Sequence, residues 1–335
     1  AVSARPLIMT EKVLALMGPT AAGKSSLAEA LAEQVGGELI SVDSALVYRG
    51  LSIGAAKPDY PHHLVHIRDP ADVYTAADFA RDAKASIADI RARGRKPILV
   101  GGSMLYFRAL VQGFDPIPAI DSDIRATIEA EAKTSGWPAL HEQLTDVDPT
   151  IAAQIHPNHS QRIGRALEVF RGTGVALSEW QRGETTTNAG DYECIALCPE
   201  DRSTLHARIA ARLDSMFAAG LVAEVQALYQ RGDLHTDLPS MRAVGYRQVW
   251  SHLNDEITLD ECREKILAAT RQLAKRQLTW LRSWPDLSWL LTDALGQVVK
   301  TEATESPSTA PDEVDTADGD GENWLTCINS VARNF

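Results

Sequence analysis

The residue pattern with the clearest chemistry lies at residues 18–25, which read Gly-Pro-Thr-Ala-Ala-Gly-Lys-Ser. In such a Gly-x4-Gly-Lys-[Ser/Thr] loop, backbone N–H groups surround phosphate oxygens, the lysine reaches the terminal phosphates and the hydroxyl binds Mg2+. The apolar run Val13–Met17 precedes the loop, so we expect a buried strand before it and a helix from Lys24. A glycine-rich turn with a solvated lysine is the alternative, but a chance match between a strand and a helix is rare. The predicted diphosphate-binding residues are Gly18, Pro19, Thr20, Ala21, Ala22, Gly23, Lys24 and Ser25, with Ser25 also the metal ligand.

Two more polar residues follow predicted buried strands. Asp43 comes directly after the strand predicted at residues 38–42, and Ser103 closes the Gly-Gly-Ser run after the strand predicted at residues 97–100. Because ligands bind at the carboxyl ends of parallel strands, we expect Thr20, Asp43 and Ser103 to converge on one site. A carboxylate there can act as a general base, hold a metal or bind a substrate hydroxyl. It can also simply cap the turn at Ser44.

The elements that position these residues alternate between strand and helix, which predicts a parallel sheet. After Asp115-Pro116-Ile117-Pro118 the pattern becomes helical, and strand character returns only at residues 191–197. We therefore expect an α/β fold, a P-loop NTPase-like parallel sheet flanked by helices, with an all-helical insertion domain and a helical C-terminal region. The expected boundaries are 1–114 for the first part of the core, 115–188 for the insertion, 189–300 for the completed core and 301–335 for an acidic tail.

Composition places the chain among soluble globular proteins. It has 335 residues, of which 44% are hydrophobic and 23% are charged. We expect a cytoplasmic protein without a membrane segment, since no apolar run approaches the roughly 20 residues of a membrane helix. The net charge is −12, but residues 301–335 alone hold eight acidic side chains and one basic one. We expect this tail to be disordered, with Trp324-Leu325 as its one candidate docking point, and its removal to leave fold and activity intact.

A long C-terminal helix is the second functional signal. The sequence Thr258-Leu259-Asp260-Glu261 is a capping box, and the helix that it opens should run to about Arg282. At 100° per residue its apolar positions form one stripe and three basic positions form the next. The apolar stripe holds Leu267, Thr270, Ala274, Leu278 and Leu281, and the basic one holds Arg271, Lys275 and Arg282. Such a row suits a phosphate backbone, whereas a merely solvated face would normally interleave acidic residues.

The remaining motifs are weaker. The segment Ser240–Gln248 places two arginines and Tyr246 around a glycine, which suits stacking on an unpaired base, and Gln161–Arg165 is basic. His62, His63 and His66 lie in one loop, and Cys194 and Cys198 lie in a predicted strand. Neither group has the further ligands of a metal site, so we expect loop histidines and core thiols without disulfides.

Together these motifs resemble the bacterial tRNA dimethylallyltransferase (tRNA isopentenyltransferase) family. The resemblance runs in order from about Lys12 to Trp289. It rests on residues 18–25, 40–48, 56–58, 67–70, 100–106, 165–169, 245–248 and 275–282. It implies transfer of the dimethylallyl group of dimethylallyl diphosphate to N6 of the adenosine immediately 3′ of the anticodon, with Mg2+. The partners would be tRNA and dimethylallyl diphosphate, and we expect a monomer.

The resemblance also implies roles for individual residues. Asp43 would be the general base on N6, with Ser103 and Arg125 at the reacting centre, and Arg212 would help to hold the diphosphate. The implied tRNA-binding residues are Asp43, Ser44, Ala45, Leu46, Gln161, Arg162, Ile163, Gly164, Arg165, Arg242, Ala243, Val244, Gly245, Tyr246, Arg247, Lys275, Arg276, Gln277, Leu278, Thr279, Trp280, Leu281 and Arg282. The chain departs from the family pattern in having Ser103 for threonine, His66 for aspartate and a shorter stretch between Pro58 and His62.

Two other functions compete with this one. A P-loop small-molecule kinase would bind ATP in the loop and use Asp43 to deprotonate a substrate hydroxyl. However, the strand at residues 97–100 ends in Gly-Gly-Ser rather than a metal-binding aspartate, and a kinase does not need the basic helix. A tRNA-binding protein without catalysis is disfavoured because Lys24, Ser25 and Asp43 are all present.

Overall fold

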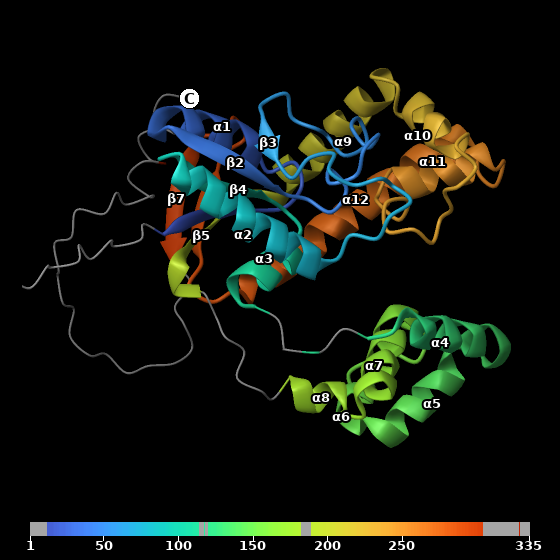
Figure 1. Ribbon diagram of the computed structural model, residues 1–335. Helices are drawn as coiled ribbons and strands as arrows, with labels where there is room; N and C mark the ends of the chain where they lie inside the picture. Colours follow the sequence, from blue (N-terminus) through green and yellow to red (C-terminus); the bar gives the residue numbers. More distant parts are fainter. Residues whose placement is uncertain (1–11, 114–116, 118–119, 182–188, 304–327, 329–335) are drawn as a thin grey trace, which may run out of the picture. The chain divides into compact units, whose positions relative to one another are not determined.

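The computed structural model describes residues 12–113, 117, 120–181, 189–303 and 328 of the chain. It divides into two compact units. The core unit comprises Ala1–Val111 with Asn188–Phe335, and the helical unit comprises Gln112–Thr187. In Figure 1 the sheet belongs to the core unit, and the described part of the helical unit consists of helices only. Each unit has a hydrophobic core of its own.

One seven-stranded sheet, in the order β3-β2-β4-β1-β5-β6-β7, forms the centre of the core unit. Its strands are β1 (Val13–Met17), β2 (Gly37–Val42), β3 (His62–His63), β4 (Lys96–Gly101), β5 (Tyr192–Pro199), β6 (Ser288–Thr292) and β7 (Val298–Ala303). All neighbouring pairs are parallel except β6 and β7, which are antiparallel. The parallel sheet predicted from the sequence is therefore confirmed, and the fold is a P-loop-like α/β fold.

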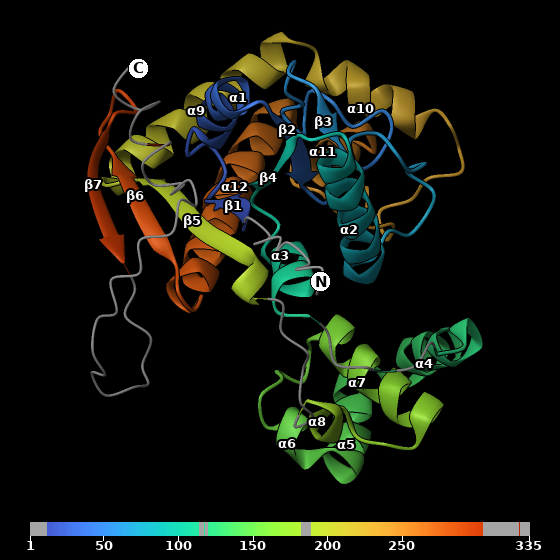
Figure 2. The same cartoon turned by 60° about the vertical axis from the view of Figure 1, so that its left-hand side comes forward.

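Helices cover both faces of this sheet (Figure 2). They are α1 (Lys24–Val35), α2 (Ala76–Ala92), α3 (Met104–Val111), α9 (Arg202–Ala218), α10 (Leu221–Tyr229), α11 (Tyr246–Leu253) and α12 (Leu259–Arg282), and the short 3-10 helix η1 (Ala189–Asp191) precedes β5. Because side chains alternate along a strand, Leu14 and Leu16 of β1 pack with α1, while Val13, Ala15 and Met17 join the core formed with the other helices. The all-apolar β1 is thus buried on both faces, as parallel strands usually are.

Local sequence signals begin several of these helices. Thr75 and Thr258 each accept the backbone N–H three residues on, while the acidic side chain at that position bonds back, so α2 and α12 both start with a capping box. Asp201 caps α9 through Ser203 N. The helix from Thr258 to Arg282 was predicted from this signal, and the structure confirms it.

The helical unit packs around a small core of its own. Its helices are α4 (Ser122–Ser135), α5 (Trp137–Val147), α6 (Pro149–Ala152), α7 (Ser160–Thr173) and α8 (Leu177–Trp180). Leu140, Leu144 and Ile163 are fully buried there. Asp148 is also buried, and its two oxygens accept hydrogen bonds from Ile151 N at 3.1 Å and Ser178 N at 2.9 Å. This carboxylate therefore joins the starts of α6 and α8 and leaves no unpaired oxygen in the core.

The expectation of a disordered tail from Thr301 onward is wrong at two places. Thr301–Ala303 belong to β7 and pair with Ser288–Leu290 of β6. Ile328 is fully buried in the core on the α1 face of the sheet, among residues such as Leu14 and Leu290. The acidic composition of the tail did not indicate this buried position, since the residues that surround Ile328 come from strands and a helix distant in sequence. The other tail residues from 304 onward, Trp324-Leu325 included, lie outside the described ones. No helix in the described part of the chain is long and apolar enough to cross a membrane.

We expect Ile328→Ala to lower the free energy of unfolding by about 2–5 kcal/mol, the usual cost of truncating a buried isoleucine. Truncation after Ala303 should lower the melting temperature at least as much as Ile328→Ala does. Thermal unfolding followed by circular dichroism measures both effects. Leu295→Ala is the matched control, because Leu295 is 85% exposed and its loss should change little. Unfolding of Ile328→Ala at the wild-type temperature would show that the tail is dispensable.

Candidate functional site

The predicted phosphate loop lies between β1 and α1, as its motif requires. Gly18 approaches β5 so closely that a Cβ atom would lie 2.4 Å from the carbonyl oxygen of Leu197, so only glycine fits. Gly23 caps α1 with φ of 96°, in the left-handed region that glycine tolerates. These two positions explain why glycines occur at both ends of the loop. The loop therefore presents the N-terminus of α1, with its partial positive charge, to an anion.

Lys24 is the main cation of this loop. Its Nζ donates a hydrogen bond to Pro19 O at 2.7 Å. Burial, followed by the positive charge of Arg212, lowers the pKa of Lys24 to about 7, and the Asp43 carboxylate partly opposes this shift. Arg212 comes from α9, and its Nη1 donates to Thr20 Oγ1 at 3.4 Å. The structure thus brings Lys24, Thr20 and Arg212 together, so a bound anion would meet two cations and a hydroxyl.

Asp43 and Ser103 meet at the adjoining ends of β2 and β4. Ser103 N donates to Val42 O at 3.2 Å, and Ser103 Oγ accepts from Ser44 N at 2.9 Å. Asp43 Oδ1 accepts from Ala45 N at 2.7 Å and Leu46 N at 3.0 Å. The carboxylate therefore does cap a turn, which was the competing interpretation of this residue. Within the described residues Oδ2 accepts no hydrogen bond, so the same carboxylate can still take a proton.

Gln277 of α12 is the residue that joins these two parts of the site. It is buried, its Oε1 accepts from Thr20 N at 2.9 Å, and its Nε2 donates to Gly102 O at 2.9 Å. The predicted convergence of Thr20, Asp43 and Ser103 is therefore confirmed, through a residue that sequence analysis had assigned to the tRNA surface. A signal existed, because at 100° per residue Gln277 lies directly beside the apolar stripe, on the side away from the basic row.

The loop after Asp43 is held by Glu224 of α10. Its carboxylate accepts backbone N–H groups of Ser52, Ile53 and Gly54 at 2.7–3.1 Å and the hydroxyl of Tyr246 at 2.5 Å. Burial, and then the hydrogen bond to Glu224, raise the pKa of Tyr246. Tyr246 is fully buried, so the interpretation of its ring as a platform for an unpaired base is wrong. Sequence analysis did not identify Glu224, since nothing near it in sequence marks a loop about 170 residues away.

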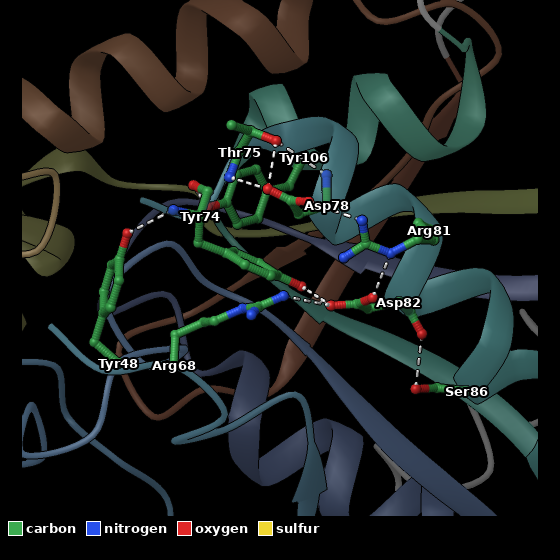
Figure 3. A network of polar contacts seen from close by, with 9 residues as sticks. All are labelled: Tyr48, Arg68, Tyr74, Thr75, Asp78, Arg81, Asp82, Ser86 and Tyr106. Carbon is green, nitrogen blue, oxygen red and sulfur yellow. Dashed lines mark hydrogen bonds and ion pairs between the residues drawn. The ribbon is translucent and has the colours of Figure 1, made fainter. Parts of the chain in front are cut away.

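The same loop is anchored at its far end by the network in Figure 3. Tyr74 N donates to the hydroxyl of Tyr48 at 3.2 Å, and Tyr74 OH donates to Asp82 Oδ2 at 3.0 Å. The guanidinium of Arg68 lies 5.3 Å from the centre of the Tyr74 ring. Burial, and then the bond to Asp82, raise the pKa of Tyr74. The network keeps these phenols neutral and ties the loop to the first turns of α2.

The three histidines of this loop have structural roles. His62 and His63 form β3 at the sheet edge, where His63 Nε2 lies 2.7 Å from Glu38 Oε2. His66 Nε2 lies 3.3 Å from Ser52 Oγ and 3.2 Å from Leu51 O, so it braces the backbone of the loop. Among the described residues no group of three or more His, Cys, Asp or Glu side chains could hold a metal ion.

The basic face of α12 is exposed as its periodicity predicts. Arg271, Lys275, Arg276, Thr279 and Arg282 face solvent, and Trp280 is half-buried with the guanidinium of Arg108 5.9 Å from its ring. Leu278 and Leu281 are buried, so their side chains cannot contact a partner directly. In the segment before α11, Arg242 is exposed, Ala243 and Val244 pack against the core, and Gly245 is buried; Arg247, in the first turn of α11, is exposed.

The helical unit contains the remaining predicted residues. Arg125 Nη2 and Arg165 Nη1 each lie 3.3 Å from Oε2 of Glu168, which is buried, while both guanidinium groups are partly exposed. Gln161 and Arg162 are exposed, Gly164 is half-buried, and Ile163 is fully buried in the core of this unit. The side chain of Ile163 therefore cannot meet a partner, whereas the arginines can.

The sheet, the phosphate loop and its lysine define a P-loop-like α/β protein built to bind a phosphorylated ligand. Residues 46–284 match the model of the family described as IPP transferase. The tRNA isopentenylpyrophosphate transferase of Bacillus halodurans is 38% identical, with 85% of this chain and 90% of that chain covered and a TM-score of 0.61. The chain therefore belongs to the IPP transferase family, which confirms the resemblance seen in the sequence.

Two more solved structures agree with this assignment. The tRNA delta(2)-isopentenylpyrophosphate transferase of Staphylococcus epidermidis is 34% identical, with 84% of this chain and 93% of that chain covered and a TM-score of 0.58. A eukaryotic dimethylallyltransferase acting on tRNA is 27% identical, with 85% and 74% covered and a TM-score of 0.70. The chain thus spans most of the length of each of these proteins.

The lowered pKa of Lys24 predicts that anion binding takes up a proton. With a pKa of about 7, Lys24 is largely neutral in the free protein above that pH, whereas a bound anion favours its charged form. We expect inorganic diphosphate at pH 8.5 to bind with uptake of about one more proton by the wild type than by Lys24→Arg, whose guanidinium stays charged. Calorimetry in buffers of different ionisation enthalpy measures this difference. At pH 5.5 the difference in proton uptake between the two proteins should vanish. A difference that is the same at pH 5.5 and pH 8.5 would contradict the prediction.

Proposed function

We propose that this protein transfers the dimethylallyl group of dimethylallyl diphosphate to N6 of the adenosine immediately 3′ of the tRNA anticodon and releases diphosphate. The observation that supports this most directly is the meeting of the phosphate loop with the Asp43–Ser103 pair through Gln277. Dimethylallyl diphosphate bound in the loop would have its leaving diphosphate on one side of the transferred group and the Asp43 carboxylate on the other. Membership of the IPP transferase family supplies the chemical class of the substrate.

On the diphosphate side, Lys24, Arg212 and the loop N–H groups would hold the leaving group. Their charge matters most as the bond between carbon and oxygen breaks, because the electron pair of that bond leaves with the diphosphate. Lys24 and Arg212 already lie close enough for the charge of one to lower the pKa of the other. The added anion would relieve that repulsion, so the site is arranged for a highly charged ligand.

On the nucleophile side, Asp43 would take the proton from N6 as the new bond between nitrogen and carbon forms. An exocyclic amine conjugated with an aromatic ring is a poor nucleophile, so removal of this proton is worth a large rate factor. Asp43 Oδ1 is held by the turn, which leaves Oδ2 to act as the base. Ser103 Oγ, bonded to Ser44 N, would border the reacting atoms. The adenosine must leave its stack to enter such a site.

Mg2+ fits the donor set at the start of α1. Ser25 is exposed beside Lys24, and its hydroxyl is the side-chain ligand that the loop motif offers to this ion. Mg2+ usually keeps several waters and binds through few protein ligands together with phosphate oxygens, so one hydroxyl suffices. When bound with the diphosphate, the ion would offset charge on the leaving group.

The tRNA would contact Arg271, Lys275, Arg276 and Arg282 of α12, Arg242 and Arg247 near the start of α11, and Arg162 and Arg165 of the helical unit. The overall negative charge does not oppose this, because much of it lies in the tail. With a tRNA and a water-soluble diphosphate as substrates, we place the reaction in the cytoplasm and take a single chain as the active species.

The kinase alternative uses the same loop but differs in a measurable way. It would need ATP in the loop and a hydroxyl beside Asp43, and it leaves the exposed cations of α12 without a purpose. Incubation with dimethylallyl diphosphate or ATP, with and without tRNA, followed by nucleoside analysis, separates the two. Productive use of ATP without prenylated adenosine would overturn the proposal.

We expect Asp43→Ala to reduce the single-turnover rate of prenyl transfer by a factor on the order of 10²–10⁴, the usual contribution of a general base. Binding of inorganic diphosphate should persist, because Asp43 acts on the nucleophile. Rapid quench with saturating tRNA measures the rate, and calorimetry measures the binding. A near-normal rate in the variant would show that another group removes the proton.

Neutralising Lys275 or Arg282 should weaken tRNA binding and reduce the slope of log K against log salt by roughly one for each phosphate that the variant no longer neutralises. Affinity for dimethylallyl diphosphate should not change. Filter binding over a salt series measures the slope. Lys265→Ala is the matched control, since Lys265 is exposed on the same helix but lies beside the acidic first turn. Slopes equal to the wild type in both test variants would remove α12 from the tRNA interface.

A further inference from the structure

Gln277 is a buried polar residue beside the apolar stripe of α12, and both ends of its amide are bonded to backbone groups. Thr20 N, its donor, belongs to the phosphate loop, and Gly102 O, its acceptor, belongs to the turn after β4. Burying an amide is costly unless its hydrogen bonds are made, so these two bonds also determine how the side chain must lie. Gln277 is therefore a fixed link between the phosphate loop and the turn after β4.

The approach at Gly102 is unusually close. A Cβ atom on Gly102 would lie 2.5 Å from Nε2 of Gln277 and 3.1 Å from the carbonyl oxygen of Gly18. Glycine at this position thus lets the helix, the phosphate loop and the end of β4 meet. The next residue, Ser103, is the one that accepts the N–H of Ser44, directly after Asp43.

Each end of the amide acts on one side of the reaction. Through Thr20 N the amide orients the phosphate loop, in which the Thr20 hydroxyl accepts a hydrogen bond from Arg212 beside Lys24. Through Gly102 it sets the position of Ser103 and, with it, the turn that bears Asp43. A transfer reaction needs the leaving group and the general base at a defined separation, and an error of about 1 Å can cost 10²-fold in rate.

We propose that Gln277 is a positioning residue that sets the distance between the diphosphate loop and the Asp43–Ser103 pair, and that it does not bind tRNA. This inference rests on the proposed prenyl transfer and deepens it. It differs from assigning Gln277 to the tRNA surface, because the side chain is buried and its amide already accepts from one backbone group and donates to another.

The amide chemistry suggests a discriminating substitution, Gln277→Glu. Its carboxylate can still accept from Thr20 N, but when ionised it cannot donate to Gly102 O. A protonated carboxyl group can do both, and burial raises the pKa of such a group. The ratio of variant to wild-type rate should therefore rise as the pH falls. Titration of groups that are the same in both proteins, such as Lys24, largely cancels in the ratio.

The experiment measures single-turnover prenyl transfer between about pH 5.5 and pH 8.5 for the wild type, Gln277→Glu, Gln277→Leu and the control Gln226→Glu, which makes the same change at an exposed position of α10. We expect the rate to fall about 100-fold for Gln277→Leu at every pH and for Gln277→Glu at high pH, with recovery of the latter toward low pH. Gln226→Glu should behave as the wild type. Direct tRNA affinity should be within about twofold of the wild type in all four proteins.

Two results would overturn the inference. One is weakened tRNA binding with a normal rate at saturating tRNA, which would return Gln277 to the RNA surface. The other is a Gln277→Glu deficit that stays constant with pH although circular dichroism shows a folded protein, which would make the residue a packing element only. If Gln277→Leu fails to fold, the pH series of Gln277→Glu alone decides. Absence of transfer by the wild type would instead refute the proposed function before any variant is compared.

Discussion

The site depends on close backbone packing where the central strands end. At Gly101 a Cβ atom would lie 2.1 Å from the carbonyl oxygen of Val42, and at Gly102 it would meet Gln277. A side chain at Gly101 would separate β2 from β4, and one at Gly102 would displace the amide of Gln277. The phosphate loop and Asp43 would then lose their common support. Two adjacent glycines therefore serve the geometry of the reaction although neither has a functional group.

A second constraint is that the loop after Asp43 must be held in place by groups other than the Asp43 carboxylate, which has to stay available as a base. Glu224 meets this need by accepting three backbone N–H groups and one hydroxyl. Arg231 adds ion pairs to Asp69 and Asp233, but such half-exposed pairs contribute only about 0–1 kcal/mol each. The main restraint is therefore the Glu224 carboxylate, since its removal would leave three half-buried backbone N–H groups and the buried hydroxyl of Tyr246 without their acceptor.

Much of the fold could be predicted because its signals are local. The apolar run of β1, the Gly-x4-Gly-Lys-Ser loop and the capping box at Thr258 each lie within a few residues, and each formed the expected element. The meeting of Asp43 with Ser103 also followed, because parallel strands bring their carboxyl ends to one edge. Ile328 was missed because the acidic and polar composition of residues 301–323 dominated the interpretation of the whole tail.

Sequence patterns are sufficient to show which residues can do chemistry and on which strands and helices they lie. The folded arrangement is needed to show which of those residues face a ligand and which face the core. Tyr246 was interpreted as a stacking surface, yet it is buried and donates its hydroxyl to Glu224. Gln277 was assigned to the tRNA surface, yet it accepts from Thr20 N and donates to Gly102 O. The reason is physical: a polar side chain can be buried only where partners exist, and those of Gln277 lie 257 and 175 residues away along the chain.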